Sequence, residues 1–255
     1  MIETIREYRE SGWLASLRPC LDLLLPPVCL ACKEPLATSR PPLFCSACAA
    51  AIRMITSPLC DCCGTPFPNS APGDHACGGC LAEKRFFSKA RSVVHYEDPS
   101  RQAIHACKYH GEGAGLSTFL LLKENNPHTA GDWPHVDYIV PVPLHRKRLQ
   151  ERGFNQALFL ARAFFPKDRR ITPHLLTRPV WSAPQTSFDG TERRTNLKNS
   201  FAVPVPDLVR GRSILLVDDV YTTGTTVNEC ARTLRRAGSA EVQALTLARV
   251  DGWLG

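Results

Sequence analysis

The stretch Ser213-Ile-Leu-Leu-Val-Asp-Asp-Val-Tyr-Thr-Thr-Gly-Thr-Thr226 decides the fold. Its apolar run, residues 214–217, is typical of a strand that is buried on both faces of a parallel sheet. Two carboxylates end the run, and small hydroxyl residues surround Gly224. The spacing predicts a helix over residues 227–237, stopped by Gly238 in the usual C-terminal position. This strand–loop–helix order places the loop at the carboxyl end of a sheet, where open α/β folds bind ligands.

The loop has the chemistry of a phosphate site. Backbone N–H groups at the helix start attract an anion, and Gly224 lets the backbone approach it closely. Asp218 and Asp219 suit the vicinal hydroxyls of a sugar and a hydrated magnesium ion. A ligand with a 5-phosphate, free 2- and 3-hydroxyls and a metal-bound diphosphate meets all these needs. We therefore expect phosphoribosyl diphosphate (PRPP), or a related phosphorylated ribose, bound with magnesium (Mg²⁺). Four hydroxyl side chains add hydrogen bonds: Thr222, Thr223, Thr225 and Thr226.

From residue 86 onward, strand-like runs alternate with helical spacing, which predicts an α/β fold with an open, mostly parallel sheet and flanking helices. Strands are predicted at residues 90–97 and 138–143, in addition to 214–217. Helices are predicted at residues 99–109, 114–123 and 155–165. Residues 145–153 are predicted to form a basic loop, and residues 124–135 a surface loop.

Ten of the twelve cysteines fall between Cys20 and Cys80, and eight of these form four C-x-x-C pairs. Two thiolates three positions apart on a turn reach one tetrahedral ion, and a second turn completes four sulfur ligands. Linkers of twelve and thirteen residues within the first two and last two pairs are close to zinc-ribbon spacing. We expect two structural zinc (Zn²⁺) sites, with sequential pairing as the default and interleaved pairing left open. The expected ligands are Cys29, Cys32, Cys45, Cys48, Cys60, Cys63, Cys77 and Cys80.

Three alternatives to zinc are weaker. A disulfide framework suits a secreted chain, but no export signal is present. A redox C-x-x-C is usually a single pair, and an iron–sulfur cluster fits the regular pairing less well. A solvated loop histidine is a better interpretation of His75 than a substitute ligand. The remaining cysteines are Cys20, Cys62, Cys107 and Cys230.

The net charge of +7 lies wholly beyond residue 85. Residues 140–200 hold twelve basic and four acidic residues. This concentration suits a polyanion such as a diphosphate or a nucleic acid, although a solvated basic surface has the same composition. No run approaches the roughly 20 apolar residues of a membrane span. The early acidic residues argue against a signal peptide, so we expect a cytoplasmic protein. The expected parts are an amphipathic segment (residues 1–25), a double zinc-ribbon module (26–85) and an α/β domain (86–255).

Residues 214–226 resemble the PRPP motif of type I phosphoribosyltransferases. From Leu23 onward the chain is similar to the ComF family, which is associated with DNA uptake. Besides the cysteine pairs, the similarity rests on Lys108-Tyr-His-Gly111, Pro141-Val-Pro-Leu-His145 and Arg152-Gly-Phe-Asn-Gln156. The resemblance implies a type I phosphoribosyltransferase-like fold, zinc, PRPP binding and handling of single-stranded DNA. It also points to a DNA translocase of the uptake machinery as a partner.

Carried over by position, the resemblance gives further residues a role. A loop at residues 141–148 would face the diphosphate, and a mobile loop at residues 185–196 would close over it. The diphosphate loop contributes Pro143, His145 and Arg148. The mobile loop contributes Gln185, Thr186, Arg193, Arg194 and Asn196. The catalytic candidates, which would stabilise the departing charge, are Lys108, Arg148 and Arg193.

Nucleic-acid contacts are expected from the basic segment before the helix at residues 155–165. The candidates are Arg152, Phe154, Asn155 and Gln156, with Trp181 and Phe188 as further stacking residues. Two candidate residues also have plainer interpretations, Asn155 as a helix cap and Lys108 as a solvated helix residue.

The expected function is that of a ComF-type PRPP-binding protein that handles single-stranded DNA during natural transformation. Two alternatives stay open. In an active phosphoribosyltransferase of base or nucleotide salvage, a nitrogen nucleophile would attack the ribose as the diphosphate leaves. The sequence shows no clear base pocket for this reaction, unless one lies in residues 86–136. The other alternative is a PRPP-sensing regulator.

Overall fold

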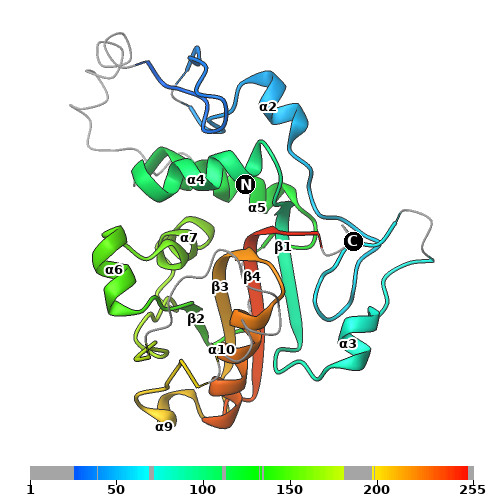
Figure 1. Cartoon of the computed structure of the whole chain (residues 1–255), viewed down its shortest axis with the longest axis vertical. Coiled ribbons are helices and arrows are strands. Elements are labelled where there is room, and N and C mark those ends of the chain that lie inside the picture. The colour runs from blue at the N-terminus through cyan, green and yellow to red at the C-terminus, as the bar shows by residue number, and fades with distance from the viewer. Residues whose placement is uncertain are drawn as a thin grey trace.

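The computed structural model describes residues 26–38, 40–68, 72–110, 113–131, 133, 135–180, 197 and 199–251 (Figure 1). For residues 107–110 and 113–116 it describes the backbone alone. The amphipathic segment predicted at residues 1–25, including Cys20, lies outside the described residues.

A sheet of four parallel strands forms the centre of the described chain, in the order β1-β4-β3-β2. The open parallel sheet is therefore confirmed. The inner strand β4 was not predicted. The strands are β1 (Lys89–His95), β2 (Tyr138–Pro141), β3 (Ser213–Tyr221) and β4 (Glu241–Arg249).

Helices join the strands and cover the sheet. They are α2 (Ser46–Ala51), α3 (Gly78–Ala82), α4 (Ser100–His110), α5 (Gly113–Asn125), α6 (Arg146–Arg152), α7 (Gln156–Phe164), α9 (Pro206–Val209) and α10 (Thr225–Arg236). The predicted strands and helices are present with ends shifted by at most two residues, except for β3, which continues four residues beyond Val217. No helix in the described ranges is long and apolar enough to cross a membrane.

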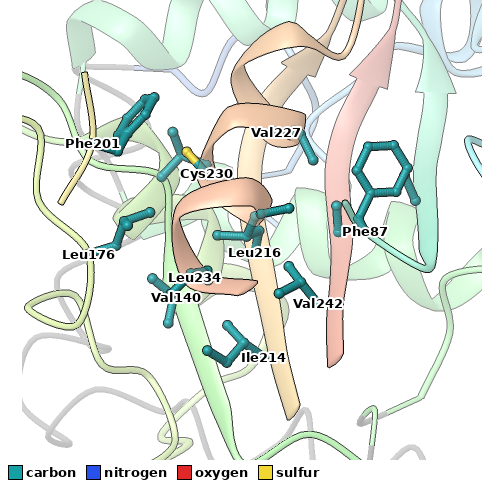
Figure 2. Packing of buried hydrophobic residues seen from close by; sticks show 14 of the residues in the cluster. Phe87, Val140, Leu176, Phe201, Ile214, Leu216, Val227, Cys230, Leu234 and Val242 are labelled. Atoms are coloured by element: carbon teal, nitrogen blue, oxygen red, sulfur yellow. The ribbon is translucent and has the colours of Figure 1, made fainter. Parts of the chain in front are cut away.

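Strand β3 is buried on both faces, as its apolar run predicts. Alternate side chains of a strand point to opposite faces of the sheet. Ile214 and Leu216 pack with Leu234 and its neighbours on α10 (Figure 2), whereas Leu215 and Val217 pack with residues of α5 and α7. Helices on both faces thus hold β3 at the centre of the core, and the loop after it emerges at a fixed place.

The prediction of a basic loop at residues 145–153 is wrong, because this segment forms helix α6. At its start, Nδ1 of His145 accepts a hydrogen bond from the N–H of Lys147 at 3.2 Å. At its end, Gly153 adopts φ 78°. The Arg, Lys, Leu, Gln and Glu residues between these caps are strong helix formers. The prediction considered only their charge.

The surface loop predicted at residues 124–135 is only partly present. Helix α5 continues to Asn125, and the next residue, Asn126, is fully buried. Its side-chain amide donates to the backbone carbonyls of Ile55 and Val93, both at 2.8 Å. A buried amide needs such partners. Asn126 therefore joins the cysteine-rich segment before β1 (residues 26–85, here called the cysteine module) to β1, instead of facing solvent.

The cysteine module runs beside β1, at the edge of the sheet opposite β2 (Figure 1). Residues 53–55 pair with this strand, and the N–H of Ile55 donates to the carbonyl of Val93 at 3.1 Å. Nearby, the N–H of Ala90 donates to the carbonyl of Cys62 at 2.7 Å. The module therefore covers backbone groups that an edge strand would otherwise expose.

Candidate functional site

The eight paired cysteines form two groups of four, with the four sulfur atoms of each group within 4.8 Å of one another. The first group is Cys29, Cys32, Cys45 and Cys48, and the second is Cys60, Cys63, Cys77 and Cys80. The Sγ atoms of Cys32 and Cys45 are 3.7 Å apart, and those of Cys63 and Cys77 are 3.6 Å apart. Zinc with tetrahedral bonds of about 2.3 Å places two sulfurs about 3.8 Å apart. Both groups fit zinc, in the sequential pairing.

Local interactions stabilise the thiolate form that zinc requires. Burial raises the pKa of Cys63, but a hydrogen bond with the Thr65 hydroxyl and the charge of Arg249 outweigh burial and lower the pKa to about 6. Burial likewise raises the pKa of Cys29, and backbone hydrogen bonds, the strongest from Cys45, outweigh it and lower the pKa to about 6. The lowered pKa values of Cys29 and Cys63 favour the thiolate in each group.

Within the described chain, neither group includes a histidine. The ring of His75 stacks on Phe67 with centroids 4.0 Å apart, and its Nδ1 lies 2.9 Å from the carbonyl of Gly73. The interpretation of His75 as a loop histidine agrees with these contacts.

The predicted PRPP loop lies where the carboxyl ends of the parallel strands meet. Strand β3 continues to Tyr221 because it stays paired with β4, so Asp218 and Asp219 belong to the strand and do not follow it. Both aspartates are half-buried. Asp218 accepts a hydrogen bond from the N–H of Asp219 at 2.9 Å, and Asp219 accepts one from the N–H of Val220 at 2.7 Å. The two carboxylates are thus held at the edge of the sheet, immediately before the loop.

The loop itself is short and ends at the first turn of α10. Thr222 and Thr223 are exposed, and the hydroxyls of Thr223 and Thr225 are 2.8 Å apart. Gly224 adopts φ 74°, and a β-carbon on it would overlap the hydroxyl of Tyr221. The N-terminus of α10, with its dipole and first-turn N–H groups, follows at once and favours an anion. The sequence analysis did not identify Tyr221 as the residue beneath the loop.

The three predicted diphosphate-loop residues lie around the turn between β2 and α6. Pro143 is buried, and His145 caps α6 as described above. Arg148 lies in the first turn of this helix, 3.8 Å from Glu151, with its side chain 25% exposed. The turn thus presents a cation at the carboxyl edge of the sheet.

Arg178 is a further cation near this edge, which the sequence analysis counted but did not single out. Its guanidinium lies over the ring of Phe201, 5.4 Å from the ring centre. Burial lowers the pKa of Arg178, the nearby charge of Arg148 lowers it further, and Asp218 opposes both. Arg178 is therefore close enough to both Asp218 and Arg148 for its pKa to respond to their charges. Arg178 also follows Thr177, whose backbone pairs with Ala202 across the base of the predicted mobile loop.

Among the nucleic-acid candidates, Asn155 acts as a helix cap. Its Oδ1 accepts from the N–H of Ala157 at 3.0 Å, and its Nδ2 donates to the carbonyl of Val142 at 3.1 Å. Arg152 donates to Oε1 of Gln156 at 2.9 Å, and both lie near the start of α7. The structure therefore supports the plainer interpretation of Asn155, while the other two keep accessible polar groups.

Phe154 lines a pocket that also contains Asp219. The pocket has an empty volume of about 260 Å³, part of it open to solvent. Phe154 packs near Phe159, with ring centres 6.2 Å apart. The pocket thus brings Phe154 and Gln156 close to the acidic end of β3. Its lining residues are Ile104, Phe119, Phe154, Gln156, Phe159, Leu160, Asp219 and Leu247.

Curated relatives match nearly the whole chain. DNA utilization protein YhgH of Escherichia coli K12 is 35% identical over 234 residues, which are 89% of this chain and 99% of the relative. Competence protein F of Haemophilus influenzae is 30% identical over 226 residues, 87% of this chain and 96% of the relative. Competence protein ComFC of Bacillus subtilis is 30% identical over 219 residues, 80% of this chain and 83% of the relative. The chain belongs to the ComF family.

Family models agree with the two parts of a ComF protein. A double zinc ribbon domain matches residues 20–81, and a phosphoribosyl transferase domain matches residues 180–252. The predicted family, the phosphoribosyltransferase-like fold and the structural zinc are thereby confirmed. The solved structure of the allosteric regulatory enzyme of purine biosynthesis is 20% identical, with a TM-score of 0.30 over 51% of this chain and 24% of that one. A similarity this low carries no argument.

The structure does not describe the side chains of several residues that were predicted from the resemblance to act in catalysis, in the mobile loop or in base stacking. Lys108 is in the last turn of α4, for which only the backbone is described. The mobile-loop residues Gln185, Thr186, Arg193, Arg194 and Asn196 lie outside the described residues, as do Trp181 and Phe188. Of the leftover cysteines, Cys230 is fully buried in α10 and Cys62 is half-buried beside the second zinc group.

Proposed function

We propose that this ComF-family protein binds magnesium–PRPP, or a related phosphorylated ribose, at the carboxyl edge of its sheet and handles single-stranded DNA. One observation carries the first part of the proposal. Two half-buried carboxylates, Asp218 and Asp219, lie near the carboxyl end of a central strand, two residues before a hydroxyl-rich loop and the N-terminus of α10. Anion-binding and hydroxyl-binding groups are thus adjacent, as a sugar phosphate requires.

Each part of PRPP has chemically suited groups nearby. The 5-phosphate suits the first turn of α10 and the threonine hydroxyls of the loop. The ribose hydroxyls suit the two aspartates, which also attract a hydrated Mg²⁺ ion. The diphosphate suits Arg148 and Arg178, because two neighbouring cations attract a polyanion more strongly than one. In this proposal the mobile-loop residues 185–196 lie over the bound ligand.

The DNA part of the proposal rests on the family and on charge. Relatives are named for DNA utilization and competence, and twelve basic residues lie in residues 140–200. Arg152 at the end of α6 and Phe154 in the turn before α7 supply a cation and an aromatic ring, the two groups that bind single strands without sequence preference. We also propose that the protein is cytoplasmic, since thiols stay reduced there and can bind zinc. We propose a DNA translocase as its partner. The division at residues 25 and 85 also remains a proposal.

Calorimetric titration tests both parts. Wild-type protein is expected to bind magnesium–PRPP, and Asp218→Asn/Asp219→Asn is expected to abolish this binding. Asp207→Asn, which removes one exposed carboxylate on α9, is the control for the loss of a surface charge and is expected to bind normally. Single-stranded DNA should bind to all variants, with an affinity that falls as salt concentration rises. Absence of PRPP binding to wild-type protein would contradict the first part, and absence of DNA binding the second.

A further inference from the structure

A buried arginine at the end of β4 joins the second zinc ribbon to the sheet. Arg249 is 6% exposed. Its Nη1 donates to the carbonyl of Cys63 at 2.7 Å, and its Nη2 donates to the hydroxyl of Thr65 at 2.5 Å. Nη2 also lies 3.8 Å from the sulfur of Cys63. Arg249 therefore contacts the backbone, a side chain and a sulfur of the turn that presents Cys60 and Cys63.

The same guanidinium lies over the ring of Tyr221, 4.2 Å from its centre. Tyr221 is 3% exposed, and the edge-on ring of Phe87 lies 6.5 Å away. A cation over an aromatic face is attracted to it, and more strongly where water is excluded. The backbone carbonyl of Tyr221 also accepts from the N–H of Val250 at 3.0 Å. The contacts that fix the ring and the backbone of Tyr221 thus come from the end of β4 and the residue after it.

Tyr221 in turn supports the phosphate loop, because its hydroxyl fills the space beside Gly224 that a β-carbon would occupy. Packed side chains transmit displacement because protein interiors have few voids. An unbroken series of contacts therefore runs from Cys63 through Arg249 and Tyr221 to Gly224.

We propose that Arg249 is a positioning residue through which the zinc-bound shape of the second ribbon sets the position of the phosphate loop. The proposal rests on the proposed function, because the loop is taken to be the site of PRPP. With zinc bound, the turn at residues 60–63 is fixed, and its carbonyl and Thr65 hold the guanidinium over Tyr221. Without zinc, the turn loses its cross-link, and a buried cation without fixed partners must rearrange.

A second arginine offers a matched control. Arg91, on β1, is also 6% exposed, and its Nη1 donates to carbonyls of the same turn, to Cys60 at 3.4 Å and to Asp61 at 3.1 Å. These hydrogen bonds, and the one from Nη1 to the carbonyl of Ala90, lie on the side of the ribbon and β1, whereas the contacts of Arg249 continue to Tyr221. Comparing the two arginines separates the support of the loop from the general stability of the ribbon.

The test compares Arg249→Met with Arg91→Met. Three quantities are measured: zinc content, affinity for magnesium–PRPP, and amide hydrogen exchange in residues 218–228. Arg249→Met is expected to keep its zinc. Its affinity for magnesium–PRPP is expected to fall roughly ten-fold or more, which is within the usual range of coupling between two sites. The amide hydrogens of its loop are expected to exchange faster. Arg91→Met is expected to match wild-type protein in affinity and in loop exchange. Equal behaviour of the two variants, or wild-type affinity and exchange in Arg249→Met, overturns the proposal.

Two additional variants keep the test decisive. If Arg249→Met does not fold, Arg249→Lys keeps the charge but loses the planar stacking and forked hydrogen bonds, and is judged by the same criteria. Cys80→Ser, which removes a ligand of the second ribbon, is expected to reproduce the faster loop exchange, and unchanged exchange also overturns the proposal. If wild-type protein binds no PRPP, the proposed function fails, while hydrogen exchange still decides whether Arg249 positions the loop.

Discussion

The side-chain amide of Asn155 joins the start of α7 to the segment after β2: it donates to the carbonyl of Val142 at 3.1 Å. Its oxygen simultaneously caps the helix by accepting from the N–H of Ala157 at 3.0 Å. His145 and Arg148 follow this segment directly. Together with the bond from the N–H of Val142 to the carbonyl of Val217 at 2.9 Å, this amide holds the segment from which the diphosphate-loop residues leave the sheet.

Two substitutions separate these roles of Asn155. Asn155→Ser keeps a capping oxygen but cannot reach Val142, so we expect the free energy of unfolding to fall by about 1 kcal/mol, the value of one hydrogen bond. Asn155→Ala also loses the cap, and a total loss of about 2–3 kcal/mol is expected. Urea denaturation measures both values. Wild-type stability in Asn155→Ser would mean that the bond to Val142 contributes nothing.

Gly224 and Gly211 form a natural pair for testing the phosphate loop. They adopt φ 74° and φ 69°, but a β-carbon would overlap Tyr221 at Gly224, whereas at Gly211 it would meet no atom of the described residues within 4 Å. Gly211→Ala is expected to cost about 1–2 kcal/mol, from backbone conformation alone. Gly224→Ala is expected to cost about 3 kcal/mol or more, since overpacking is added, and to lose PRPP binding. Equal losses in a denaturation experiment would contradict the contact with Tyr221.

Two closed four-cysteine sites predict about two zinc ions per purified chain. A chelator strong enough to remove them is expected to unfold the ribbons, because metal binding and folding are coupled in such modules. Zinc affinity is also expected to fall as pH falls, because protons compete for the thiolates. Protons compete for Cys32, Cys48, Cys77 and Cys80, whose pKa values are raised, already at neutral pH, and the fall steepens below about 6, where Cys29 and Cys63 are protonated as well. Circular dichroism after chelation measures the unfolding, and metal analysis at several pH values measures the pH effect. Iron in place of zinc would refute the assignment.

The features that could be predicted from sequence are local. A C-x-x-C pair carries half of a zinc site within four residues, and the string from Ser213 to Thr226 carries a strand, a loop and a helix start. Hydrophobic periodicity predicted most helices and strands correctly, because it too depends only on residues that are close in the sequence. The error at α6 was also local, since the helix propensity of residues 146–152 was present but was given less weight than their charge.

The features that could not be predicted join distant residues. Arg249 and Cys63 are 186 positions apart, and Asn126 and Ile55 are 71 apart. Nothing near Arg249 in the sequence distinguishes it from a solvated arginine at a strand end, and the same holds for Arg178. Packing decides which polar residues are buried, and packing depends on the order of strands in the sheet. The inner strand β4, which was not predicted, is the element that brings Arg249 to Tyr221.

Glu229 on α10 holds Asn199, which follows the predicted mobile loop. Its carboxylate accepts from the N–H of Asn199 at 2.7 Å and from Arg232 at 2.5 and 2.8 Å. Burial raises the pKa of Glu229, but the bonds from Arg232 and Asn199 outweigh burial and lower the pKa below its ordinary 4.5. Because the folded state then binds the proton less readily than the unfolded state, this stabilisation is present above pH 4.5 and is lost as pH falls through the folded pKa.

Glu229→Gln is therefore expected to lower the free energy of unfolding by about 1–2 kcal/mol at neutral pH. The difference from wild-type protein should shrink as pH falls from 4.5 through the folded pKa. Asp207→Asn, at an exposed carboxylate, should stay within about 0.5 kcal/mol throughout, and a pH-independent loss in Glu229→Gln would exclude the linkage.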